Sequence, residues 1–218
     1  MHKEVTIAPP LMETAVFPIV GTAPLMIARF SKKAELMAKM SEGRAGGNKK
    51  KRDARNYAAE AEEAAYLAAE GWYGMNAAAF RNASISACRL VGFKMTMAKL
   101  ALFVEADGFD ERDGTPLVRI YGDPPEVNTM HTRNATGVVD VRARPMWRPG
   151  WRMNLKVRFD ADQFTLADVT NLIARVGMQV GIGEGRPDSK SSAGLGFGLF
   201  RLETVSEASE TGQGTPLA

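Results

Sequence analysis

Clustered arginines and lysines are the residues of this sequence whose types and spacing point most clearly to a chemistry. One cluster lies between Val141 and Phe159, a stretch that contains no acidic residue. Its cations are Arg142, Arg144, Arg148, Arg152, Lys156 and Arg158. Because each cation that contacts a phosphate releases condensed counterions, the cluster predicts a polyanion such as nucleic acid as its partner. A solvated polar surface is the alternative, although an inert surface normally intersperses acids among its bases.

A second basic cluster runs from Arg44 to Arg55, where Asp53 alone opposes the cations. It consists of Arg44, Lys49, Lys50, Lys51, Arg52 and Arg55. Glycines mixed with like charges favour a mobile loop here. One interpretation is an electrostatic arm that closes over a bound strand, with Lys49, Lys50, Lys51 and Arg52 as the clamp. The other is a charged loop that only aids solubility.

A glycine-rich segment from Gly181 to Gly196 is the third candidate. Its glycines permit positive φ and close approach of another backbone, and successive exposed N–H groups in such a turn form an anion-binding nest. They are Gly181, Gly183, Gly185, Gly194 and Gly196, and Arg186 and Lys190 add positive charge. The segment lacks the Gly-Lys-Ser/Thr of a Walker loop, and it follows a helix, which argues against a dinucleotide-binding fingerprint. A flexible connection is the alternative.

His131 and several aromatic residues complete the candidates. His131 lies near Arg133 in the same segment and is a candidate for a general acid or base in RNA cleavage. A lone histidine in a polar loop is more often a contact residue. Four aromatic side chains are candidates for stacking on bases, namely Trp72, Tyr73, Trp147 and Trp151, although Trp147 and Trp151 could equally pack in the core. Cys88 is expected to be a small core residue.

The composition excludes several classes of protein. The 218 residues are 45% hydrophobic and 24% charged, which is ordinary for a globular chain. No apolar run is long enough to span a membrane, and the first residues do not form a secretion signal. The single cysteine and two histidines argue against an internal disulfide and a Cys/His zinc site, and they favour a reducing, cytoplasmic location without a cofactor. The net charge is only +3, so attraction to nucleic acid depends on local clustering.

Hydrophobic periodicity and capping residues predict the elements that position these residues. The predicted strands are 14–20, 100–105, 117–121, 138–144, 152–159 and 197–203, with an extended segment at 25–30. The predicted helices are 31–40, 54–70, 76–91 and one that begins at Thr165, where Asp168 stands at the capping-box position. Leu90 and Leu166 are assigned to the buried stripes of the last two helices.

This order predicts an α+β protein with a ferredoxin-like antiparallel sheet and helices on one face. Residues 1–205 form a single domain, with a helical insertion at about 31–75 and a long inter-strand loop at about 122–137. The tail 206–218 is expected to be disordered. The uncovered sheet face would carry Arg119, Tyr121, Arg142, Arg144, Arg152, Lys156 and Arg158.

The glycine-rich segment resembles the hallmark loop of the RAMP superfamily, the RNA-binding subunits of CRISPR effector complexes. The similar stretch runs from Val180-Gly-Ile-Gly-Glu-Gly-Arg-Pro through Gly194-Leu-Gly-Phe-Gly-Leu-Phe200. A second likeness, to a family of small uncharacterised proteins of tailed phages and prophages, covers Pro18–Ala34, Tyr73–Arg89 and Gly181–Phe200. That family is expected to have a tryptophan where this chain has Gly185, and a shorter loop before the last glycines.

The resemblance implies a scaffold that binds single-stranded RNA or DNA and self-associates, either as a filament along the strand or within a larger ribonucleoprotein. In that comparison the 122–137 loop, with His131 and Arg133, would be similar to a thumb that reaches a neighbouring subunit. The 31–75 insertion would be similar to an inserted helical domain.

The sequence therefore predicts a non-enzymatic protein that binds single-stranded nucleic acid, with no metal. The expected contact residues are Arg29, Lys32, Lys49, Lys50, Lys51, Arg52, Arg119, Arg133, Arg142, Arg144, Arg152, Lys156, Arg158, Gly181, Gly183, Gly185, Arg186 and Lys190. Two alternatives stay open. One is a RAMP-type endoribonuclease that uses His131, and the other is a phage structural or assembly protein.

Overall fold

The computed structural model describes residues 7–29, 55–133, 139–189 and 194–204. Several predicted features lie outside these residues. They are the helix at 31–40, the tail, and the contact residues Lys32, Lys49, Lys50, Lys51, Arg52 and Lys190.

The main sheet has four antiparallel strands in the order β11-β1-β10-β5. They are β1 (Met12–Gly21), β5 (Leu102–Glu105), β10 (Arg152–Asp160) and β11 (Phe200–Leu202). β10 alternates as predicted, because Met153, Leu155, Val157 and Phe159 are buried while the residues between them are more exposed. β1 pairs with β10 over nine residues, from Met12 opposite Asp160 to Val20 opposite Arg152.

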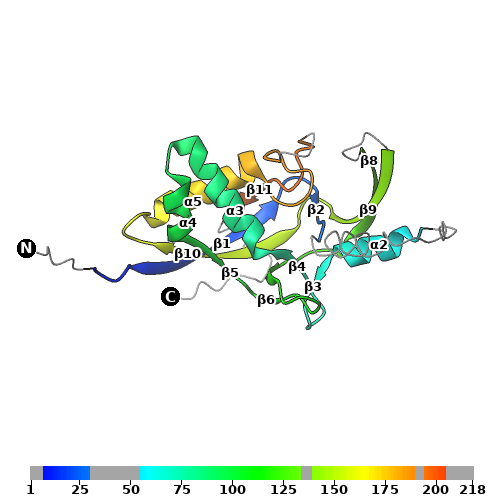
Figure 1. Cartoon of the computed structure of the whole chain (residues 1–218), viewed down its shortest axis with the longest axis horizontal. Coiled ribbons are helices and arrows are strands. Elements are labelled where there is room, and N and C mark those ends of the chain that lie inside the picture. The colour runs from blue at the N-terminus through cyan, green and yellow to red at the C-terminus, as the bar shows by residue number, and fades with distance from the viewer. Residues whose placement is uncertain (1–6, 30–54, 134–138, 190–193, 205–218) are drawn as a thin grey trace, which may run out of the picture.

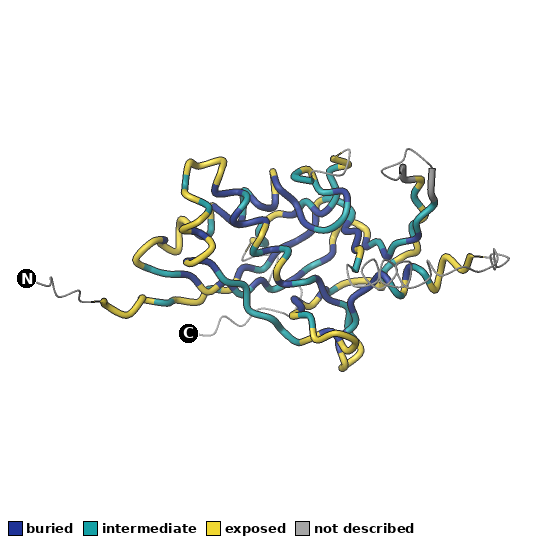
Figure 2. Tube along the Cα trace, viewed as in Figure 1, coloured by how far each residue is buried: buried dark blue, intermediate teal, exposed yellow. Residues whose placement is uncertain are grey.

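Helices cover one face of this sheet (Figure 1). α3 (Ala77–Ala87) begins at Asn76, whose side chain accepts a hydrogen bond from the N–H of Ala78, as the sequence predicts. α5 (Leu166–Arg175) begins at Thr165 with the predicted capping box. The buried positions of both helices and of the strands form one core, seen as the dark centre of Figure 2. The α+β class is therefore confirmed.

Two smaller sheets flank the main one. The first has the order β3-β4-β7-β6, with β3 (Tyr66–Leu67), β4 (Tyr73–Asn76), β6 (Gly108–Phe109) and β7 (Pro116–Arg119). The second has the order β2-β9-β8, with β2 (Leu25–Met26), β8 (Glu126–Arg133) and β9 (Val139–Trp147). The remaining elements are α2 (Tyr57–Ala64), which contacts β9, the turn η1 (Cys88–Val91), α4 (Met95–Ala101) and the turn η2 (Val176–Val180).

Some sequence predictions were wrong. The expected loop at 122–137 contains the strand β8. Pairing with β9 stabilises this strand, and the polar sequence of β8 does not predict it. The helix expected over 54–70 spans only Tyr57–Ala64 and is followed by β3. Leu90 and Leu166 are half exposed, because each lies at a helix end beyond the packed stripe. Within the described ranges, no helix has the length and apolar character needed to cross a membrane.

Candidate functional site

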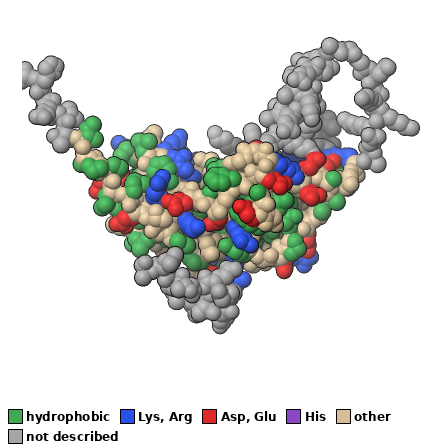
Figure 3. Space-filling model, turned by 90° about the horizontal axis from the view of Figure 1, so that it is seen from below, with side chains coloured by type: hydrophobic (Ala, Val, Ile, Leu, Met, Phe, Trp, Pro, Cys, Tyr) green, Lys and Arg blue, Asp and Glu red, His purple; other side chains and the backbone are tan. Residues whose placement is uncertain are grey.

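The open face of the main sheet lies on the side away from the helices. β10 directs Arg152, Asn154, Lys156 and Arg158 to this face, because they alternate with its buried residues. Figure 3 views the molecule from this side, and cationic, acidic and apolar side chains are interspersed across it. The predicted basic sheet face is thus present in part, but it is not purely basic.

A backbone bridge extends this face into the small β3-β4-β7-β6 sheet. Tyr121 and Arg152 exchange two hydrogen bonds, from Tyr121 N–H to Arg152 O (2.8 Å) and from Arg152 N–H to Tyr121 O (3.0 Å). As a result Arg119, the last residue of β7, and Tyr121, which follows β7, lie beside the outward residues of β10. The sequence placed these residues on one face, and the bridge is the contact that joins them.

Aromatic rings accompany the cations along this face. The guanidinium of Arg119 lies 5.1 Å from the ring centroid of Tyr121 and 5.7 Å from that of Trp72. The guanidinium of Arg158 lies 5.3 Å from the ring of Phe103, a β5 residue that pairs with it across the strands. These distances are typical of cation–π contacts. We call the whole set the aromatic–basic strip, made of Trp72, Phe103, Arg119, Tyr121, Arg152, Lys156 and Arg158.

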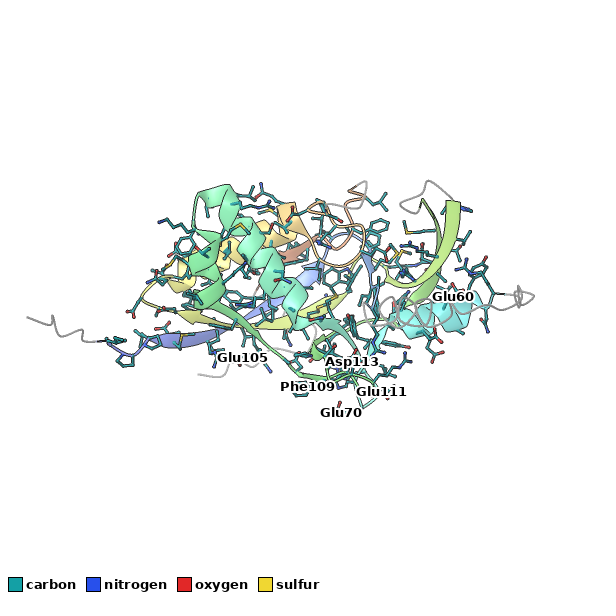
Figure 4. All side chains as sticks on the ribbon, in the orientation of Figure 1. Glu60, Glu70, Glu105, Phe109, Glu111 and Asp113 are labelled. Atoms are coloured by element: carbon teal, nitrogen blue, oxygen red, sulfur yellow. The ribbon has the colours of Figure 1, made fainter. Side chains whose placement is uncertain are left out.

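Acidic residues from distant parts of the chain compensate the strip. Asp107 accepts a hydrogen bond from Lys156 Nζ at 2.9 Å, and this interaction raises the pKa of Lys156 above its ordinary value. The Arg152 side chain pairs with Glu203 at 3.0 Å. Glu105 lies opposite Lys156 on β5, on the lower side of the sheet in Figure 4. The stretch 141–159 contains no acidic residue in sequence, but acidic residues from other parts of the chain lie next to it in the folded structure.

The arginines of β9 belong to a different surface. Arg142 and Arg144 lie on the β8–β9 hairpin rather than on the main sheet, so the prediction that they share a face with β10 was wrong. Arg144 Nε donates to Glu184 Oε2 at 2.7 Å, and Arg148 pairs with Glu126 at 2.8 Å. The sequence could not reveal these pairs, because they depend on which sheet β9 joins.

The glycine-rich segment is packed against the chain itself. Its N–H groups donate internally, from Ile182 to Gly198 O (3.1 Å), from Glu184 to Met26 O (2.8 Å) and from Gly198 to Pro24 O (2.7 Å). A Cβ on Gly185 would come within 2.9 Å of the Phe197 ring, so no space is left there. The prediction of an open anion-binding nest is therefore wrong for these groups.

The charged residues of this segment are also engaged. Arg186 donates to the carbonyl of Gly183 at 3.1 Å. Asp188 pairs with Arg89 at 2.9 Å and accepts from Ser86, which ties the segment to the end of α3. The positive φ of Gly181 (+70°) and Gly183 (+75°) serves this close packing, so their role in the described structure is architectural.

Arg29 is buried rather than presented to a ligand. Its side chain is 6% exposed and pairs with Asp110 at 2.9 Å and with Asp113 at 2.8 Å. The ring of Tyr66 lies 5.9 Å from its guanidinium. Asp113 lies in the turn after β6, close to Glu111 in Figure 4. The prediction that Arg29 contacts nucleic acid was wrong, because these two acids, 81 and more residues away, enclose it.

The remaining candidates are placed as follows. Trp147 and Trp151 are 3% and 2% exposed, and Trp151 Nε1 donates to the carbonyl of Ala23 at 2.9 Å, so both are core residues. Cys88 is buried, and burial raises the pKa of its thiol. His131 is exposed on β8, beside Arg133 in sequence. Among the residues that the structure describes, no three His, Cys, Asp or Glu side chains gather as a metal site would require.

Comparison with known proteins gives no further assignment. No protein-family model matches the chain, and no curated protein is detectably similar to it in sequence. The functional interpretation therefore depends on the geometry of the aromatic–basic strip.

The close packing of the glycine-rich segment and of the turn that follows it predicts a contrast between Gly196 and Gly198. Gly198 has φ +68° and a Cβ there would overlap the carbonyl of Ile182, whereas Gly196 has φ +75° with no heavy atom near that position. We expect Gly196→Ala to lower the free energy of unfolding by about 1–2 kcal/mol through backbone strain alone. Gly198→Ala should cost more than about 3 kcal/mol, because the chain must also move. Urea denaturation of both variants measures these changes in the free energy of unfolding. Equal decreases for Gly196→Ala and Gly198→Ala would contradict the close packing at Gly198.

The ion pair between the buried Arg29 side chain and the partly exposed Asp113 predicts a pH dependence of stability. Hydrogen bonds from Thr115 and then the charge and hydrogen bond of Arg29 lower the pKa of Asp113 to about 2. The folded pKa is below the unfolded one of about 3.9, so this stabilisation is complete above about pH 5 and is lost as the pH falls towards about 2. Asp113→Asn should therefore be less stable than wild type near neutral pH, by on the order of 1 kcal/mol, since part of the side chain is open to solvent.

Urea denaturation at a series of pH values tests this prediction. The difference between wild type and Asp113→Asn should narrow as the pH falls towards about 2, where the carboxyl becomes protonated. Thr115→Val keeps the side-chain shape but removes the hydroxyl donor, and should reduce the pH dependence. A difference that stays constant over the whole range would show that the carboxylate charge is not the cause.

Proposed function

We propose that this chain is a non-enzymatic protein that binds single-stranded RNA or DNA across the aromatic–basic strip. The observation that carries the proposal is the position of Arg119 between the rings of Trp72 and Tyr121, with a backbone bridge from Tyr121 to Arg152 on β10. Alternating cations and rings suit a single strand, because cations contact its phosphates while rings stack on its bases.

The topology supports a ferredoxin-like assignment for the main sheet. α3 lies between β1 and β5 in sequence, and α5 lies between β10 and β11. Together with the order β11-β1-β10-β5, this fits a β-α-β-β-α-β unit in which the fourth strand lies beside the first. Folds of this kind that bind RNA use the sheet face that the helices leave open.

The flanking elements fit the RAMP-like interpretation by position. The β8–β9 hairpin would act as the thumb, with His131 and Arg133 on β8, and α2 would belong to the inserted helical region. Self-association along the bound strand, and a phage or prophage origin, remain part of this proposal. Fold likeness alone does not establish a function, so the strip has to be tested directly.

The acidic residues around the aromatic–basic strip determine how strongly charge alone can contribute to binding. Asp107 and Glu203 already satisfy Lys156 and Arg152, and a phosphate must compete with these carboxylates. We therefore expect the stacking contacts to contribute as much as the charges. The affinity should be weakly sequence-specific and should fall as salt is raised.

Fluorescence anisotropy with labelled single-stranded oligonucleotides tests the site. Tyr121→Ala should weaken binding by about 5- to 150-fold, because a stacked base contributes roughly 1–3 kcal/mol. Lys156→Ala should weaken binding and reduce the slope of log affinity against log salt by about 0.7, the value for one phosphate contact on a single strand.

Arg175→Ala is the matched control for charge, because Arg175 lies in the last turn of α5, on the helical side of the sheet. It should bind as wild type does. Equal losses in Arg175→Ala and Lys156→Ala would mean that only the overall charge matters and would remove the strip as the site. Cleavage of the RNA that disappears in His131→Ala would instead favour an endoribonuclease.

A further inference from the structure

The exposed side of α5 and η2 carries a row of side chains that point away from the main sheet. We call it the α5 row, and its members are Ala167, Asp168, Asn171, Ala174, Arg175 and Met178. All of them are exposed or partly exposed, whereas Val169, Leu172 and Ile173 of the same helix are buried. Because the helices cover one face of the main sheet, the row lies on the opposite side of the molecule from the aromatic–basic strip (Figure 1).

A groove runs beside this row, between the α5–η2 segment and the turn η1, and has a volume of about 830 Å³. Phe93 and Phe164 line it, with their ring centroids 4.7 Å apart. On the η1 side Val91 is 52% exposed, and on the η2 side Met178 is 65% exposed. Exposed apolar surface with polar residues around it is typical of protein–protein contact sites.

The charges of the α5 row are self-complementary about Asn171. At 1.5 Å per residue, Asp168 lies about 4.5 Å before Asn171 along the helix, and Arg175 lies about 6 Å after it. Because successive residues are rotated by about 100°, Asp168 and Arg175 lie within about 20° of each other, on one side of Asn171. Ala167 and Ala174 have the same relation to each other on its other side.

We infer that α5 packs antiparallel against α5 of a second copy of this chain, about a two-fold axis at the level of Asn171. Asp168 of each copy then meets Arg175 of the other, offset by only about 1.5 Å along the helix. A two-fold contact requires that each residue pair occur twice with the roles exchanged, and the α5 row meets this requirement with opposite charges. This charge complementarity is what identifies the partner as the same chain.

The two charged residues are placed for this contact. Thr165 holds the carboxylate of Asp168 through its N–H at 3.0 Å and its hydroxyl at 2.7 Å. Arg175 contacts Gln179 at 3.4 Å on the surface, a long hydrogen bond that the carboxylate of the other copy would replace. The acid is thus fixed in position, and the arginine gains a stronger partner.

The uncharged residues of the row also fit. Ala167 and Ala174 are small and let the two helices approach closely, while the two Asn171 amides face each other and can exchange hydrogen bonds. Met178 follows Asn171 by seven residues and Phe164 precedes it by seven. Met178 of one copy therefore comes to the phenylalanine end of the other copy's groove, where a thioether packs well against aromatic rings.

Such a dimer has its helices in the centre and its two main sheets on the outside. The two aromatic–basic strips face outwards on opposite sides, so each copy binds its own short oligonucleotide whether or not the dimer forms. The contact needs no nucleic acid, and it uses a different surface from any association along a bound strand.

Disulfide trapping tests the position of the two-fold axis. Packed helices have axes about 8–10 Å apart and Cα atoms about 2.3 Å from the axis, so facing Cα atoms are about 5 Å apart, within reach of a disulfide. Asn171→Cys should therefore form a covalent dimer under mild oxidation. Leu166→Cys is the matched control, because Leu166 is 54% exposed but its two copies would lie about 15 Å apart. Wild type controls for the buried Cys88.

Charge reversal followed by mixing tests the pairing itself. Arg175→Glu places acids opposite each other at both ends of the contact, and Asp168→Lys places cations there, so each variant alone should be a monomer by light scattering. In an equal mixture every charge meets its opposite, and a dimer should form that contains one copy of each variant. Asp168→Lys also weakens the helix cap, but a loss of stability cannot produce association on mixing.

The outcomes that would overturn the inference are distinct. A wild type that is monomeric at high concentration, with no disulfide through Asn171→Cys, is one. Equal cross-linking through Leu166→Cys is another. The third is a mixture of Arg175→Glu and Asp168→Lys that stays monomeric while circular dichroism shows that both variants are folded.

Discussion

The strict alternation of β10 organises the molecule around it. Its buried residues face α3 and α5 and fill the core, while Arg152, Lys156 and Arg158 face away from the helices. Because the side-chain period of a strand is two, a shift of one residue would send every cation into the core. The nine-residue pairing with β1 prevents that shift, and the same pairing places Arg158, Lys156 and Arg152 opposite Thr14, Val16 and Val20. The β1–β10 register therefore determines both which residues of β10 fill the core and which lie on the open face.

Placing cations close together on a sheet has an electrostatic cost that other parts of the chain offset. Arg152, Lys156 and Arg158 lie on one face of a strand. Acids approach this face from two segments: Glu105 and Asp107 at the end of β5 lie near Lys156, and Glu203 after β11 pairs with Arg152. A compensated surface of this kind is stable without a ligand, and it still offers exposed cations beside aromatic rings. Its affinity for a polyanion must be lower than that of an uncompensated patch, and this is why we assign a large share of the binding to the rings.

The sequence predicted the features that depend on local spacing. The alternation of 152–159, the capping box at Thr165 and the cap at Asn76 each involve residues close in sequence, and each is confirmed. The features that were wrong depend on distant partners. Nothing near Arg29 in sequence indicates that Asp110 and Asp113 enclose it, and nothing near Arg144 indicates that β9 joins a separate sheet and meets Glu184. Arg142 and Arg144 were lost from the predicted basic face for this reason, while its β10 and β7 parts were retained.

The role of the glycine-rich segment likewise could not be predicted from local sequence. Glycines with positive φ suit both an anion nest and a tight passage of one backbone over another, and the two uses have the same composition. In this structure the glycines serve the tight passage of one backbone over another. The N–H groups of Glu184 and Gly198 donate to the carbonyls of Met26 and Pro24, in the chain beyond β1, and are not open to an anion. The segment therefore acts on the open face only indirectly. It fixes the chain between β1 and β2 against η2 and β11, and so holds the first strand of the main sheet in the register that presents the strip.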